Sequence, residues 1–290
     1  MNYTIKNDFL TVVINDFGAE LQSIKSNKSG IEYLFQGDEK NWEGKSPILF
    51  PICGRLHDKT YTYKGKTYNM ETHGFASKSL FTVKEQTEDA ITFSLVENPK
   101  TLKQYPFKFE LIASFKVKEN SLIQNFSVVN RDGDTLPFAL GFHPGFNALE
   151  RGVPIREHTV TFDKKCHPIS LGFNKYGFCN GKDYEFKLDN DVSFKITDNL
   201  FENDSLFLSE MSDMATFSCP NSNKSIVLKY TDMTHLGLWT AVGEPFVCIE
   251  PWHGIPGREN VIEDFGDRKL FIYLNKGKTY NTYFEIQINE

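Results

Sequence analysis

The sequence lacks the features that are typical of helical, membrane-spanning and secreted proteins. Only 8 of its 290 residues are Ala, the best helix former, which disfavours a helical bundle. No apolar run approaches the ~20 residues that span a bilayer. The opening MNYTIKNDFL has no basic start, apolar stretch or cleavage site of a secretory signal. We therefore expect a soluble cytoplasmic protein with no membrane partner.

Positive charge and paired cysteines are also scarce. The 32 Lys and Arg against 38 Asp and Glu give a net charge of −6, which argues against a nucleic-acid partner. The 5 cysteines are odd in number and form no C-x-x-C, so neither a disulfide framework nor a zinc ribbon is predicted. The P-loop, G-x-S-x-G, H-E-x-x-H, H-x-H and dinucleotide motifs are all missing. We expect no metal and no other cofactor, and a small molecule as the partner.

Aromatic strand formers, by contrast, are abundant, with 26 Phe, 12 Tyr and 3 Trp. From Phe107 to Val117 the odd positions are apolar and the even ones mostly polar, with Ile112 the exception, which predicts a long strand. A turn at Glu119-Asn120 leads into a second strand over Leu122–Val129, so the pair predicts an antiparallel hairpin. Further strands are expected at Leu10–Ile14, Tyr61–Tyr63, Ala90–Val96, Val192–Ile196, Ser225–Tyr230, Phe246–Glu250, Leu270–Leu274 and Tyr283–Ile288.

Nothing in the chain marks a domain boundary. There is no 12-residue segment with helical periodicity, no repeat of fixed period and no low-complexity linker. We therefore expect residues 1–290 to form a single all-β domain, a large antiparallel β-sandwich. Sheets of this size twist and curl, so one concave face should be open to a ligand.

Glu250 is the clearest candidate for chemistry, because it lies within the apolar run Phe246-Val247-Cys248-Ile249-Glu250-Pro251-Trp252. A buried carboxylate is costly unless it is paired or protonated, and desolvation would raise its pKa toward the range of a general acid or base. A structural ion pair with an arginine is the alternative interpretation.

Two histidines and one arginine have comparable settings. His143 lies in Gly141-Phe142-His143-Pro144-Gly145-Phe146 and His73 in Thr72-His73-Gly74-Phe75. Each could transfer protons at a strand end or be a neutral core histidine. Arg55 follows an apolar run and could clamp a ligand oxygen or pair with a carboxylate such as Glu250 or Asp204.

The tryptophans and cysteines are most simply structural. Trp239 and Trp252 are expected in the core, although an exposed ring could stack on the apolar face of a sugar. The cysteines are expected to be reduced and mostly structural: Cys53, Cys166, Cys179, Cys219 and Cys248.

Four short motifs, taken together and in this order, resemble the aldose 1-epimerase (galactose mutarotase) family, and in particular its shorter LacX-type branch. The motifs are Gly54-Arg55, His73-Gly74-Phe75, Gly141-Phe142-His143-Pro144 and Ile249-Glu250-Pro251-Trp252. The resemblance covers essentially the whole chain. It implies the large β-sandwich of that family and a cofactor-free site on the concave face.

The resemblance also implies roles for individual residues. Glu250 would be the general base that removes the proton of the anomeric hydroxyl, and His143 the general acid that protonates the ring oxygen. His73 resembles the second catalytic histidine of the family, which assists at the ring or a neighbouring hydroxyl. Arg55 resembles the arginine that binds sugar oxygens. Asp204 resembles the aspartate that binds hydroxyls away from the anomeric carbon. The implied activity interconverts the α and β anomers of a hexose.

Three alternatives stay open at this stage. A hexose 6-phosphate 1-epimerase would need a basic pocket, for which Arg55, Lys78 and Arg258 are candidates. A non-catalytic carbohydrate-binding protein could keep the same fold. A glycoside hydrolase would need two carboxylates at one site, such as Glu250 with Asp204. The identity of the sugar and the oligomeric state are not specified by the sequence.

Overall fold

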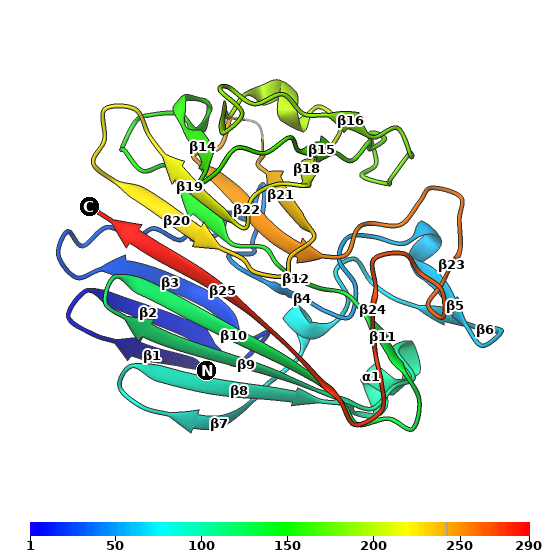
Figure 1. Cartoon of the computed structure of the whole chain (residues 1–290). Helices are drawn as coiled ribbons and strands as arrows, with labels where there is room; N and C mark the ends of the chain where they lie inside the picture. The colour runs from blue at the N-terminus through cyan, green and yellow to red at the C-terminus, as the bar shows by residue number, and fades with distance from the viewer. Residues whose placement is uncertain (242) are drawn as a thin grey trace.

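Nearly all of the regular structure is β-strand in the computed structural model, which describes residues 1–241 and 243–290 (Figure 1). Two large sheets, one of nine and one of eight strands within these residues, carry most of the chain. Every strand pair within these two sheets is antiparallel. The all-β antiparallel architecture expected from the sequence is confirmed.

The elements have the following bounds. The nine-stranded sheet contains β7 (Thr82–Gln86), β8 (Ala90–Val96), β9 (Phe109–Lys118), β10 (Ser121–Asn130), β14 (Thr159–Phe162), β17 (Ser193–Lys195), β19 (Met214–Ser218), β20 (Ser225–Lys229) and β25 (Thr279–Asn289). The eight-stranded sheet contains β4 (Ile48–Leu49), β12 (Leu140–Phe142), β13 (Gly145–Asn147), β15 (Ile169–Ser170), β16 (Tyr184–Glu185), β18 (Leu206–Ser209), β21 (His235–Trp239) and β22 (Phe246–His253).

Smaller elements complete the fold. Three small sheets contain β1 (Asn2–Lys6), β2 (Leu10–Asn15) and β3 (Glu20–Ser26); β11 (Leu136–Phe138) and β24 (Ile272–Leu274); and β5 (Thr60–Tyr63), β6 (Lys66–Asn69) and β23 (Glu263–Asp264). Helix α1 spans Pro99–Gln104, and short 3-10 turns cover His57–Lys59, Ala76–Lys78, Ile155–Glu157 and Asp198–Phe201. Within the described residues, no helix has the length and apolar composition needed to cross a membrane.

The β9–β10 hairpin forms as the alternation predicts. Leu122 pairs with Val117 and Phe126 with Ala113, so the turn lies at Glu119-Asn120. The odd positions of β9 are buried, while the even positions are half-buried or exposed. Ile112, the exception in the pattern, is half-buried on the outer face. One face of this sheet therefore packs inward and the other faces outward. The hairpin is the pair of long green strands labelled β9 and β10 in Figure 1.

Aromatic side chains fill the space between the two large sheets. Phe142 of β12 lies 4.2 Å from Phe126 of β10 and 5.6 Å from Phe284 of β25, measured between ring centroids. All three rings are buried, and each contributes about 1.5–3 kcal/mol through its removal from water. This contact packs β12, which ends next to His143, against the nine-stranded sheet.

Some strand ends differ from the prediction. The strand expected at Leu270–Leu274 begins at Ile272, because Leu270 has a positive φ of 61° and is exposed. The strand expected at Phe246–Glu250 continues to His253, with Pro251 paired to Leu236. Within the described residues, β5 and β23 pair in parallel, which the sequence pattern did not indicate.

Candidate active site

Strand β22 carries Glu250 on a face that points away from the main core. Side chains alternate along a strand, so Val247 and Ile249 join the core while Cys248 and Glu250 share the opposite face. Glu250 is only 1% exposed. A carboxyl group so fully removed from water needs a partner close by.

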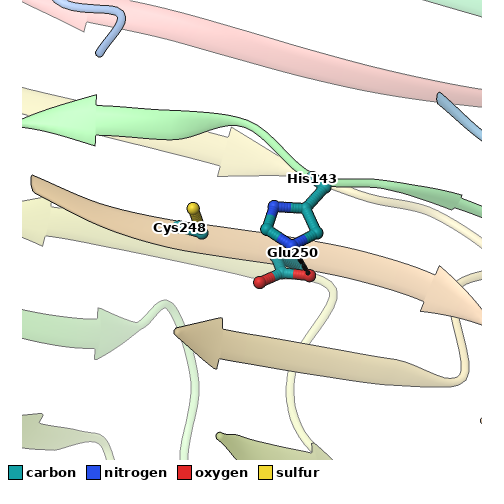
Figure 2. Close-up of side chains that lie close together, drawn as sticks. All are labelled: His143, Cys248 and Glu250. Carbon is teal, nitrogen blue, oxygen red and sulfur yellow. Dashed lines mark ion pairs between the residues drawn. The ribbon is translucent and has the colours of Figure 1, made fainter. Parts of the chain in front are cut away.

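The strand register supplies that partner. Gly141 of β12 pairs with Trp252 and Gly145 of β13 pairs with Cys248, so His143, between them, lies level with Glu250. His143 Nε2 is 3.2 Å from Glu250 Oε2, the contact dashed in Figure 2. The Gly-Phe-His-Pro-Gly motif and the Glu-Pro-Trp motif, far apart in sequence, are therefore adjacent strands of one sheet.

On its other side Glu250 faces Gly237 of β21. A Cβ atom at Gly237 would lie 2.6 Å from Cζ of Phe207, closer than such atoms approach. Glycine at this position therefore lets the Phe207 ring lie beside the carboxyl-bearing strand. The ring helps to exclude water from that neighbourhood.

Burial changes the ionisation of both partners. Desolvation raises the pKa of Glu250 well above its ordinary value, and the charge of Asp204 raises that pKa further. Desolvation lowers the pKa of His143 to about 4. Both shifts favour a protonated carboxyl beside a neutral imidazole over an ion pair.

His73 lies against the same pair. Its ring is 5.6 Å from that of His143 and 5.5 Å from that of Trp252. His73 Nδ1 accepts a hydrogen bond of 3.1 Å from the backbone N–H of Gly54, so the neutral ring carries its proton on Nε2. Burial lowers the pKa of His73 well below its ordinary value, and His143 and Arg55 lower that pKa further. The ring is thus a neutral hydrogen-bond donor.

Arg55 and Asp204 meet across the cavity wall. Arg55 Nη2 lies 3.5 Å from Asp204 Oδ2, and Nη1 donates to the carbonyl of Tyr176. Gly177, with a φ of +71°, passes so close that a Cβ atom there would lie 2.6 Å from Asp204 Oδ2. Both side chains keep about a third of their surface exposed, so they remain available to a ligand.

All five predicted site residues line one cavity of about 230 Å³: Arg55, His73, His143, Asp204 and Glu250. Aromatic rings complete its walls. Trp252 is buried in the core as expected and also lines this cavity. Trp239, expected in the core, is half-buried in the cavity wall, as is Trp42, for which the sequence gave no signal. The Trp42 ring lies 4.9 Å from that of His143 and 5.7 Å from that of Trp239.

Among the described residues that line this cavity, positive charge is sparse. Arg55 is the one Lys or Arg among those lining this cavity, and it already faces Asp204. Arg258 pairs with Glu263 at 3.2 Å and lines a different cavity, and Lys78 does not line this one. A larger cavity, about 410 Å³, lies beside Arg151 and Arg156 and contains none of the five candidates.

Cys248, which sequence reasoning classed as structural, is a neighbour of Glu250 and His143. Sγ of Cys248, a ring nitrogen of His143 and a carboxyl oxygen of Glu250 all lie within 4.8 Å of one another (Figure 2). The available signal was its position two residues before Glu250, which places both side chains on one face of β22.

Comparison with known proteins identifies the family of the chain. A sequence model described as aldose 1-epimerase matches residues 1–287. The chain belongs to the aldose 1-epimerase family. It is 32% identical to the plasmid-encoded protein LacX of Lactococcus lactis subsp. lactis over 91% of this chain and 92% of that protein.

Solved structures of the family share the fold over its full extent. The galactose mutarotase related enzyme of Lactobacillus acidophilus has a TM-score of 0.95 and 32% identity, covering 100% of this chain and 98% of its own. A galactose mutarotase-like protein of Lactobacillus casei has a TM-score of 0.93 and 28% identity, covering 100% of both chains. Family membership supports an isomerase that acts on a sugar.

Proposed function

We propose that the protein is a cofactor-independent aldose 1-epimerase that interconverts the anomers of an unphosphorylated aldose. The observation that carries the proposal is the 3.2 Å contact between Glu250 Oε2 and His143 Nε2 inside a cavity lined by Arg55 and Asp204. Family membership supports the same reaction class.

Mutarotation needs an acid and a base at adjacent points. The anomeric hydroxyl and the ring oxygen are bonded to the same carbon, so the groups that serve them must also be neighbours. Glu250 takes the hydroxyl proton while His143 gives a proton to the ring oxygen, and the bond between the anomeric carbon and the ring oxygen breaks. Rotation about C1–C2 and reclosure by the reverse transfers give the other anomer.

The ionisation of the pair suits this exchange. In the free enzyme, burial favours a protonated Glu250 and a neutral His143, so the pair has one proton to transfer. Moving that proton across the 3.2 Å contact yields a carboxylate base and an imidazolium acid without exchange with solvent. The reaction returns the same proton count in either direction, so no metal or redox partner is required.

The remaining residues bind the sugar. Arg55 donates hydrogen bonds to sugar oxygens, and Asp204 accepts from hydroxyls away from the anomeric carbon. His73 donates from Nε2. The indole faces of Trp42 and Trp239 take the apolar face of the ring. With a single cation in the lining, a phosphate at C6 would lack the bidentate partners that phosphate sites use.

Polarimetry on freshly dissolved α-glucose and α-galactose, with and without protein, tests the proposal. We expect the approach to equilibrium to be accelerated, and to remain so after exhaustive chelation. Saturable sugar binding without acceleration would indicate a carbohydrate-binding protein instead. Faster turnover of glucose 6-phosphate than of glucose would overturn the unphosphorylated assignment, and release of nitrophenol from a nitrophenyl glycoside would indicate a hydrolase.

A further inference from the structure

The acid–base pair has a third neighbour with different chemistry. Cys248 Sγ, a ring nitrogen of His143 and a carboxyl oxygen of Glu250 lie within 4.8 Å of one another, and all three residues are buried. We propose that these three side chains form an inhibitory site for Zn²⁺. The binding does not depend on the proposed function, whereas the inhibition does.

The donor set matches the preference of zinc. Thiolate, imidazole and carboxylate are the three side-chain ligands that Zn²⁺ takes in proteins, whereas Mg²⁺ and Ca²⁺ prefer oxygen alone. Metal–ligand distances of about 2.0–2.3 Å place the ligands of a tetrahedral ion about 3.3–3.8 Å apart. The 3.2 Å between His143 and Glu250 is already close to that separation.

The backbone holds the three donors in place before any ion arrives. Cys248 and Glu250 are two residues apart on β22, and His143 is fixed opposite them by the pairing of Gly145 with Cys248. Gly145 also lets the Trp42 ring lie beside these strands, since a Cβ atom there would lie 2.8 Å from Cζ3 of Trp42. Little rearrangement is therefore needed to close the site.

The ring nitrogen available to an ion is the one that faces Glu250. That nitrogen is Nε2, 3.2 Å from Oε2, and His143 is 8% exposed. His143 and Glu250 both line the 230 Å³ cavity, so an ion can enter there and keep one coordination position toward the space the sugar would occupy. On binding, the thiol proton and the transferable proton of the pair pass to solvent, so the pair can no longer exchange protons with a sugar.

Cobalt is the probe that separates binding from activity, because Zn²⁺ itself is spectroscopically silent. We expect Co²⁺ titrated into the reduced full-length protein to give the near-ultraviolet sulfur-to-metal band of a thiolate ligand at one equivalent. Zn²⁺ should displace it, and saturating sugar should compete. Absence of that band would overturn the site whether or not the protein proves to be a mutarotase.

Cys248→Ala is the decisive variant, with Cys219→Ser, another buried cysteine, as its matched control. Loss of a direct ligand should weaken metal binding by at least about 100-fold, since removal of outer-shell partners alone costs 10–100-fold. Cys219→Ser should bind as the wild type does. Cys248→Ala should keep its mutarotase activity while zinc inhibition shifts to at least about 100-fold higher concentration. An unchanged cobalt band or unchanged zinc inhibition in Cys248→Ala would contradict the proposal.

Discussion

Strands β9 and β22 lie in the two large sheets and share the alternating geometry of a β-strand, but they differ in which of their side chains are buried. β9 alternates buried and accessible positions, so its outer face carries Lys116 and Lys118 toward water. β22 is buried at every position from Phe246 to Trp252, including Glu250. In β9 the polar residues face water. In β22 the carboxyl group of Glu250 is removed from water, which shifts its pKa, and groups with shifted pKa values are typical of functional sites.

Substitution of the acid–base pair should give the largest effect. Glu250→Gln and His143→Asn nearly preserve volume but cannot exchange the proton, so each should lower kcat by at least ~100-fold. Polarimetry or NMR exchange between anomers measures this, and circular dichroism confirms folding. Near-normal turnover in either folded variant would remove that residue from proton transfer.

The same Glu250→Gln variant should be more stable than the wild type near neutral pH. Because burial raises the pKa of Glu250 above its unfolded value, the folded protein binds a proton that the unfolded chain lacks, and stability falls as pH rises. The amide needs no proton, so Tm should rise by at least about 2 °C at pH 8, and by less near pH 4. An equal or lower Tm at pH 8 would mean that the carboxyl is not buried at a cost.

Activity should be lost in acid only at an unusually low pH. The active form holds one transferable proton, and the second is taken up as pH falls through the pKa of His143, which burial lowers to about 4. After subtraction of the uncatalysed rate, kcat/KM should be flat near neutrality and fall about tenfold per unit below about pH 4. An acid limb near the ordinary histidine pKa would show that the ring is solvated in the free enzyme.

Changes at the sugar-binding pair should be smaller and of another kind. Asp204→Asn and Arg55→Lys should raise KM by about tenfold with kcat nearly unchanged, because these groups bind substrate and transition state alike. Preference between glucose and galactose, which differ at C4, should change in Asp204→Asn. Steady-state kinetics on both sugars decide it, and a pure kcat loss with unchanged preference would exclude Asp204 from binding.

Substitution on the outer face of β9 should have the smallest effect. Lys116 is exposed and faces Asp89 at 3.7 Å, a solvent-screened contact. Lys116→Gln should change the free energy of unfolding by no more than about 0.5 kcal/mol and leave kcat and KM as they are. Denaturant titration and polarimetry check this, and a larger change would mean that the outer face has a role beyond solvation.

The same contrast explains what could be predicted from sequence. β9 and β10 were predictable because one solvated face imposes alternation, and Glu250 because a carboxylate in an apolar run has few explanations. The buried ends of β22 and the short strands β12 and β13 show no such alternation. Trp42 could not be found, since its position against His143 depends on long-range contacts. The contact between Cys248 and His143 depends on how β22 pairs with the strands on both sides of it, and the sequence of a single strand does not specify that pairing.

The close approach of Phe207 to Gly237 has a consequence for how this protein can diversify. The ring fills the place where a side chain on β21 would be, so a larger residue at Gly237 would push it toward the sugar. A smaller residue at Phe207 would open the same wall without touching an acid, a base or a hydrogen-bonding group. Substitutions at Gly237 or Phe207 can therefore change which sugars fit, while Glu250 and His143 stay the same.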